Sequence, residues 1–186
     1  AQSRTPDEVC VVFDGFDDVG EALAEDHPVV TEILKRREIS GGPAVPRDLG
    51  WNRIRERIDY IHFLDSDDLI SPRFYERLSE VLEDHRSLSA VRVGSRSVDE
   101  EEIVERDGRF DWEDFEDISI DRIHVENFLD VHPLPCSFVL LRGDAVERIR
   151  TEGRIWRGCS LDSPDGKQDY LEDLDFFFRI MALGTL

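Results

Sequence analysis

The chain has 186 residues, 40% of them hydrophobic, which is enough for one domain with its own core. It carries 43 Asp and Glu against 23 Lys and Arg, a formal net charge of −20, so we expect no nucleic-acid partner. Its 3 cysteines are widely spaced and predict neither a disulfide framework nor a zinc site. No apolar run approaches the roughly 18 residues of a transmembrane segment, and no signal peptide opens the chain. We therefore expect a cytoplasmic protein.

Strands and helices are expected to alternate along the first half of the chain. The apolar run at 8–13 ends in Asp14-Gly15 and predicts a buried strand, and Asp18 is placed to cap a helix. A later helix is expected to have Ser71 as its cap and Pro72 at its first position. The expected elements are strands at 8–13, 29–36 and 60–64, a glycine-rich loop at 40–43, and helices at 18–23, 47–58 and 71–82.

The second half is less regular, because the stretch 99–130 is dense in carboxylates. A hairpin is expected at 104–112, where Asp107-Gly108 suits a tight turn. Alternating strands and helices predict an α/β fold with a mostly parallel central sheet flanked by helices. The further expected elements are a strand at 136–141, a helix at 144–149, a loop at 153–169 and a helix at 171–183.

Three of the expected helices show an apolar face at helical spacing. Such a face is expected to pack on the sheet. The apolar residues are Leu49, Ile54 and Ile58 in the helix at 47–58; Phe74, Leu78, Val81 and Leu82 in the helix at 71–82; and Leu171, Leu174, Phe177, Phe178 and Met181 in the helix at 171–183.

A run of acidic residues, Asp65-Ser66-Asp67-Asp68, directly follows the apolar strand at 60–64. In open α/β sheets, ligands bind at this end of a strand. Adjacent carboxylates repel one another unless a cation joins them, and Mg²⁺ or Mn²⁺ is held by one or two carboxylates plus substrate phosphates. Asp is also favoured in turns and at helix starts, so both interpretations stay open at this point.

Three further positions are candidates for chemistry. Glu172-Asp173 opens the last helix, where acidic residues suit the helix dipole or where one carboxylate serves as a general base. Asp14, at the end of the first strand, could accept hydrogen bonds from a nucleobase or ribose. Arg47 follows the glycine-rich loop and could contact a diphosphate bidentately, although a lone Arg is usually a surface residue.

Taken in order, four segments resemble motifs of the family-2 glycosyltransferases. The segment 11–18 (VVFDGFDD) is similar to "VVDDGSTD", and 42–50 (GPAVPRDLG) is similar to "G-x-x-x-ARN-x-G". The segment 60–72 (YIHFLDSDDLISP) is similar to "YI-x-FLDSDD-x-x-x-P", and 171–184 is similar to "ED-x-D-x-x-x-R-x-x-x-x-G". The resemblance implies a single GT-A-type catalytic domain over 1–186. Its nucleotide- and metal-binding half would be 1–82, and its acceptor-binding half 83–186.

The resemblance also implies a reaction, the inverting transfer of a sugar from a UDP- or GDP-type donor to an acceptor hydroxyl on a glycan, lipid or protein. Mn²⁺ or Mg²⁺ would bind the departing diphosphate and act as a Lewis acid. The implied roles are nucleobase contact for Asp14, base or diphosphate contact for Arg47, ribose and metal contact for Asp65 and Asp67 with Asp68 alongside, the general base for Asp173, and orientation of acceptor or base for Glu172.

The chain departs from the family pattern at several points. Phe13 stands where a first Asp is frequent, and Asp48 stands where Asn is common. The opening strand with its "PTYN" turn has no counterpart, so an exposed sheet edge is expected. Two alternatives follow: an inactive nucleotide-sugar-binding or interaction module of the same fold, and a nucleotidyltransferase-like enzyme that has no role for Asp173. His124 and His132 are left out of the metal site.

Overall fold

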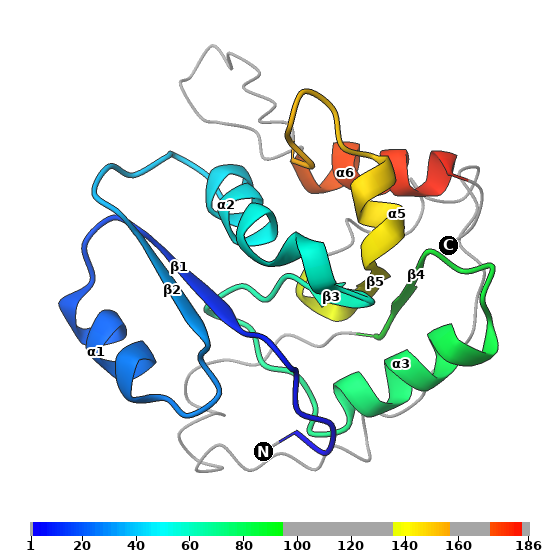
Figure 1. The fold of residues 1–186 in the computed structure, drawn as a ribbon, viewed down its shortest axis with the longest axis horizontal. Helices are drawn as coiled ribbons and strands as arrows, with labels where there is room; N and C mark the ends of the chain where they lie inside the picture. Colours follow the sequence, from blue (N-terminus) through cyan, green and yellow to red (C-terminus); the bar gives the residue numbers. More distant parts are fainter. Residues whose placement is uncertain (1, 95–135, 157–171, 184–186) are drawn as a thin grey trace.

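The structure is a computed structural model that describes residues 2–94, 136–156 and 172–183 (Figure 1). Its helices and strands alternate along the chain, which confirms the expected α/β class. The strands are β1 (Cys10–Asp14), β2 (Glu32–Arg36), β3 (Tyr60–His62), β4 (Ala90–Arg92) and β5 (Val139–Arg142). The helices are α1 (Asp18–Asp26), α2 (Ala44–Ile54), α3 (Phe74–Asp84), α5 (Gly143–Arg148) and α6 (Glu172–Ala182), with short 3₁₀ turns η1 (Arg55–Arg57) and η3 (Cys136–Phe138).

The described strands form two groups. β1 and β2 pair in parallel, as expected, with Val12 opposite Leu34. β5 lies between β3 and β4 and runs antiparallel to both. The larger described sheet is therefore antiparallel, which corrects the expectation of a mostly parallel one. The physical reason is that a short apolar run indicates burial on both faces but carries no information on strand direction.

β5 is the centre of the core, because its two faces are buried against different helices. Val139 and Leu141 point to one side, where they join a cluster with residues of α2, α5 and α6. Leu140 points to the other side, where it meets Phe74 and Leu78 of α3. This alternation is the period of two of a β-strand, and it places three helices over one face of the sheet and α3 over the other (Figure 1).

The helices agree with expectation at α3 and differ at α2. Of the four expected apolar positions of α3, Phe74, Leu78 and Leu82 are buried and Val81 is partly buried. Of the apolar residues expected in the helix at 47–58, Ile54 and Ile58 pack against the core, but Leu49 stays 37% exposed, so its expected burial is wrong. The buried residues of α2 are instead Ala44, Asp48 and Trp51. These three positions follow the i, i+4, i+7 spacing of one helix face, but the aspartate in the middle disguises the pattern.

Element boundaries differ from expectation by a few residues at several places. Asp17, rather than Asp18, caps α1 by accepting the Gly20 backbone N–H at 2.9 Å. Helix α6 (Glu172–Ala182) lies within the expected range 171–183, but its fully buried residues include Phe176 and Ile180, which were not among the expected ones. β4 was not expected at all. The expected hairpin at 104–112, His124, His132 and most of the expected loop at 153–169 lie outside the described residues.

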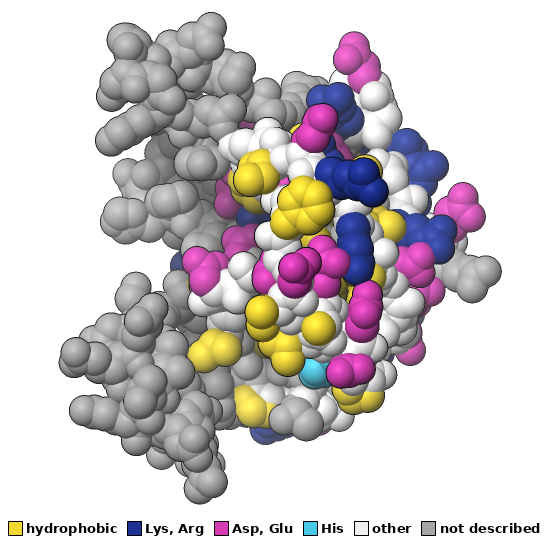
Figure 2. Space-filling model, turned by 90° about the vertical axis from the view of Figure 1, so that its left-hand side faces the viewer, with side chains coloured by type: hydrophobic (Ala, Val, Ile, Leu, Met, Phe, Trp, Pro, Cys, Tyr) yellow, Lys and Arg dark blue, Asp and Glu magenta, His cyan; other side chains and the backbone are white. Residues whose placement is uncertain are grey.

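Helix α1 lies on the outer side of β1 and β2 and has no buried residue (Figure 1). The same side of the molecule carries hydrophobic side chains interspersed with acidic and basic ones (Figure 2). Val19 and Leu23 of this helix are 72% and 68% exposed. None of the helices in the described ranges is long and apolar enough to cross a membrane.

The central position of β5 makes its side chains the most sensitive to truncation. We expect Leu141→Ala, at a fully buried site, to lower the free energy of unfolding by about 2–5 kcal/mol, because it removes packed methyl groups and leaves a cavity. Leu23→Ala, at an exposed site, should change it by less than ~0.5 kcal/mol. Urea unfolding of both variants measures the contrast, and equal effects would contradict the assigned core.

Candidate functional site

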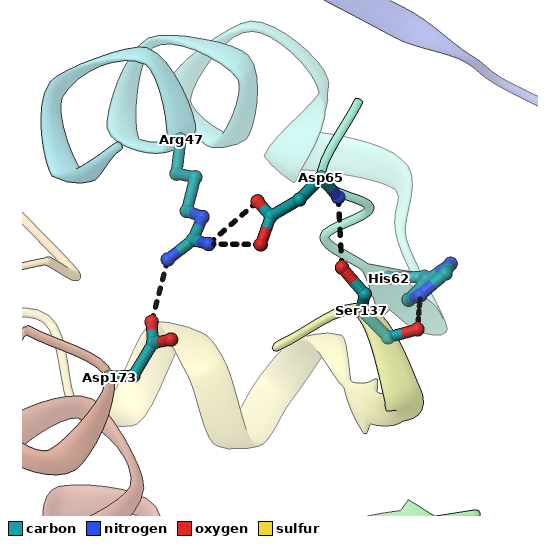
Figure 3. Close-up of polar contacts among 5 residues, drawn as sticks. All are labelled: Arg47, His62, Asp65, Ser137 and Asp173. Atoms are coloured by element: carbon teal, nitrogen blue, oxygen red, sulfur yellow. Dashed lines mark hydrogen bonds and ion pairs between the residues drawn. The ribbon is translucent and has the colours of Figure 1, made fainter. Parts of the chain in front are cut away.

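The side chain of Arg47, near the start of α2, lies between two acidic residues that are remote in the sequence (Figure 3). Its Nη1 donates to Asp173 Oδ1 at 2.6 Å. Its Nη2 donates to both carboxylate oxygens of Asp65, at 2.7 and 3.0 Å. The Arg47 side chain is only 9% exposed. One buried guanidinium therefore joins the acidic run after β3 to the first turn of α6, and these are the two segments that the sequence singles out.

Local structure explains why Asp65 faces Arg47. Asp65 comes three residues after the end of β3, and its backbone N–H donates to the Ser137 hydroxyl at 2.9 Å. The Asp68 N–H donates back to the Asp65 carbonyl at 3.2 Å, so the acidic run forms a turn. Ser137 is fully buried in η3, just before the central strand β5. The core of the domain therefore holds the backbone of the acidic run.

Burial changes the ionisation of the acidic groups around Arg47. Burial raises the pKa of Asp173, and the charge and hydrogen bond of Arg47 oppose that rise only in part. The pKa of Glu172, which is 7% exposed, is raised for the same reason. Burial alone would lower the pKa of Arg47, but the neighbouring acidic groups, Cys136, Asp173 and Asp65, more than offset this and raise it. Asp173 is thus a carboxylate of increased basicity beside a permanent cation.

Trp156 forms a platform under Arg47 that sequence reasoning missed. The Arg47 guanidinium carbon lies 4.7 Å from the centre of the Trp156 ring, a cation–π distance. On its other side the ring stacks on Phe176 of α6, with centroids 4.1 Å apart and planes at 10°. Trp156 is fully buried. It lies in a segment expected to be a loop, so the only signal in the sequence was the large aromatic side chain itself.

His62 is a second residue that sequence reasoning missed. Its Nε2 lies 2.7 Å from the Ser137 carbonyl oxygen, and its Nδ1 lies 3.0 Å from the Tyr75 hydroxyl. Because a carbonyl only accepts, Nε2 carries the proton and Nδ1 accepts from Tyr75. Burial lowers the pKa of His62 to about 4. The imidazole is therefore neutral at pH 7 and supports the same η3 turn that holds Asp65.

Asp14 lies at the end of β1, as expected, but in its own network. It accepts from Arg36 Nη1 at 2.9 Å and from the Ser40 backbone N–H at 2.9 Å, and it also accepts from the Ser40 hydroxyl. These contacts hold the loop after β2 against the carboxyl end of β1. Among the described residues, no hydrogen bond or ion pair joins Asp14 to Arg47, so the expected site is divided into two local networks.

The remaining predicted site residues lie around the Arg47 contact. Asp67 is exposed, Asp68 is half-buried, and Glu172 is buried next to Asp173. Within 2–94, 136–156 and 172–183, no three His, Cys, Asp or Glu side chains converge as a metal site built from protein alone would need.

Comparisons with known proteins identify the family and the fold of the chain. Residues 1–150 match the sequence model described as Glycosyl transferase family 2, which is most of the chain, so the protein belongs to this family. No curated protein matches the chain. A solved structure titled "Crystal structure of S. aureus TarS" superposes with a TM-score of 0.58 at 16% sequence identity. The match covers 96% of this chain and 29% of that one, so this chain spans under a third of its length. The GT-A-type fold class is thereby confirmed.

His62 predicts a specific dependence of stability on pH. Its pKa is about 4 in the folded protein and ~6.5 in the unfolded chain. Between these values the unfolded state binds more protons, so the stabilisation is complete above pH ~6.5 and is lost as pH falls toward 4. We expect His62→Gln to remove a fall in unfolding free energy of on the order of 3 kcal/mol between pH 7 and 4.

The matched control for this measurement is His85→Gln, because His85 is exposed at the end of α3. Urea unfolding at pH 7 and pH 4 is compared for the wild type and both variants, which cancels the contribution of the carboxylates. The His85 variant should keep the wild-type difference between the two pH values. A His62 variant with an unchanged pH difference would contradict the neutral buried imidazole.

Proposed function

We propose that the chain is the catalytic core of an inverting, metal-dependent glycosyltransferase that uses a UDP- or GDP-type sugar donor, of hexosyl type. The acceptor is a hydroxyl of a glycan, lipid or protein. The observation that carries this proposal is the contact of Arg47 with both Asp65 and Asp173. It brings the motif assigned to the donor and the motif assigned to the acceptor together around one cation, as transfer between two bound substrates requires.

In the proposed reaction, Asp173 takes the proton of the acceptor hydroxyl. The acceptor oxygen then forms a bond to the anomeric carbon, on the face opposite the nucleoside diphosphate. The bond from that carbon to the diphosphate oxygen breaks, and the electron pair leaves with the diphosphate, which inverts the configuration. The raised pKa of Asp173 supports the role of general base, and buried Glu172 would orient the acceptor or the base.

The charge balance of the site supports the need for a divalent cation. Asp65, Asp67, Glu172 and Asp173 surround Arg47 or lie next to the residues that contact it. An anionic nucleoside diphosphate would be repelled by this excess of carboxylates unless a further cation bound with it. Asp65 and Asp67 would hold Mn²⁺ or Mg²⁺ with the diphosphate, and the bound metal would stabilise the negative charge of the leaving group.

The other expectations from the sequence remain part of the proposal. Asp14 would contact the nucleobase from the end of β1, Asp68 would support the donor ribose, and Arg47 would contact the diphosphate. A cytoplasmic location is proposed on the composition of the chain. The acceptor would bind to the half of the domain that follows residue 82.

A second candidate, a nucleotide-sugar-binding module without turnover, is favoured by one observation. The Asp173 carboxylate is engaged by Arg47 in this structure, which reduces its availability as a base. The two candidates share the donor site and differ in the role of Asp173. A third candidate, the nucleotidyltransferase-like enzyme, would also bind a nucleotide with metal but would not use Asp173.

The donor site predicts nucleotide binding that depends on metal. We expect calorimetry to detect binding of UDP or GDP in the presence of Mn²⁺ and its loss on adding EDTA. Asp67→Asn should weaken binding about tenfold or more, because it removes a metal ligand. Asp84→Asn, an exposed Asp at the end of α3, should leave the affinity unchanged. If neither nucleotide binds with or without metal, the donor-site assignment fails.

The role of Asp173 predicts a separation of transfer from binding. Asp173→Asn should reduce transfer by about 10²–10⁴-fold while the affinity for the nucleotide with Mn²⁺ stays near the wild-type value. Release of nucleoside diphosphate over a panel of donors and acceptors measures transfer. Asp144→Asn makes the same exchange at an exposed Asp in the first turn of α5 and should retain full activity. Unchanged transfer in Asp173→Asn would remove it as the base.

A further inference from the structure

Asp48 is the buried charge on the inward face of α2, and it is 8% exposed. It directly follows Arg47, but no ion pair is formed by its carboxylate within the described residues. Its Oδ1 instead accepts two backbone N–H groups, from Ile155 at 2.9 Å and from Trp156 at 3.1 Å. Burial raises its pKa. Burying a carboxylate costs free energy unless hydrogen bonds compensate it. Here the compensation comes from the two backbone N–H groups, so Asp48 and the segment 155–156 hold each other in place.

The held segment is the one that carries the Trp156 platform. The indole Nε1 of Trp156 is buried and has no hydrogen-bond partner among the residues that the structure describes, so none of these positions the ring through its polar group. The position comes from the backbone and from ring contacts, with Phe176 stacked on one face and Phe63 packed edge-on at 5.4 Å. The backbone hydrogen bonds of this segment to Asp48 connect it to α2, the helix that also carries Arg47.

Arg179 of α6 holds the same segment from the carbonyl side. Its Nη1 donates to the Ile149 carbonyl at 2.9 Å, and its Nη2 donates to the Ile155 carbonyl. Residues 155 and 156 are therefore fixed through their N–H groups by α2 and through a carbonyl by α6. Their backbone has little freedom to move the indole ring.

Two neighbouring residues of α2 thus contact the same tryptophan. Asp48 accepts the backbone N–H of Trp156, and the Arg47 guanidinium lies over its ring. We propose that Asp48 is a positioning residue of the candidate site, which holds Trp156 under Arg47 and so fixes the guanidinium between Asp65 and Asp173. This proposal rests on the proposed function only for the role of Arg47 as a site residue. Its geometry stands without any assumption about substrate or metal.

The test compares two substitutions of the same side chain. Asp48→Asn keeps an oxygen at the position of Oδ1, so both backbone hydrogen bonds can form. Asp48→Ala removes the acceptor. Where Asp48→Ala fails to fold by circular dichroism, Asp48→Gln replaces it, because its amide oxygen is displaced by one methylene and cannot align with both N–H groups.

The readout is the nuclear magnetic resonance signal of the Arg47 Nε–H group, assigned by its loss in Arg47→Lys. A guanidinium over an indole ring has a proton signal shifted upfield by the ring current, and Trp156→Leu should abolish this shift. We expect Asp48→Asn to keep the upfield shift and Asp48→Ala or Asp48→Gln to lose it while the fold is retained. A shift that survives in Asp48→Ala or Asp48→Gln, or is lost equally in Asp48→Asn, would overturn the proposal.

A second measurement separates this proposal from the proposed function. Affinity for UDP or GDP with Mn²⁺ should fall in Asp48→Ala and stay near wild type in Asp48→Asn, whereas a purely structural role would lower only the free energy of unfolding. If the wild type binds neither nucleotide but the resonance pattern is as expected, the proposed function fails and the positioning role stands. If nucleotides bind and the resonance pattern is absent, the positioning role fails alone.

Discussion

The arrangement of the site depends on one buried cation shared by two carboxylates. Arg47 is 9% exposed, and its two terminal nitrogens contact Asp173 and Asp65 at 2.6 and 2.7 Å. Without the guanidinium, two partly buried carboxylates would face each other, which is unfavourable for both. The end of β3 and the start of α6 are therefore fixed relative to each other through α2, although far apart along the chain.

The elements that carry this contact are held by the same core that stabilises the domain. η3 precedes the central strand β5. Its Ser137 accepts the Asp65 N–H through its hydroxyl and the Nε2–H of neutral His62 through its carbonyl oxygen. On the opposite side, Phe176 of α6 packs under Trp156. Packing of the core and placement of the charged groups are thus coupled, since a shift of β5 or α6 would move one of the two carboxylates.

Much of the fold and of the candidate site could be predicted from the sequence. The features that could not be predicted have one physical cause in common. The buried face of α3 followed from local periodicity. Ordered motifs pointed to Arg47, Asp65 and Asp173, and the structure brings these three side chains into contact. The inward face of α2 could not be predicted in this way, because Asp48 places a charged residue between apolar ones on that face. Its partners are backbone groups of residues 155 and 156, remote in the sequence. Strand direction in β5 and the role of His62 depend on distant pairing in the same way.

The contact between Arg47 and Asp173 also makes the pKa of Asp173 depend on whether an anion is bound to Arg47. Burial raises the pKa of Asp173, and Arg47 lowers it through its charge and hydrogen bond. Any anion that competes for the guanidinium removes part of the opposing effect and makes the carboxylate more basic. A diphosphate is such an anion, and a guanidinium binds it well. In the proposed function, the donor side of the site is therefore coupled electrostatically to the acceptor side, through a single side chain.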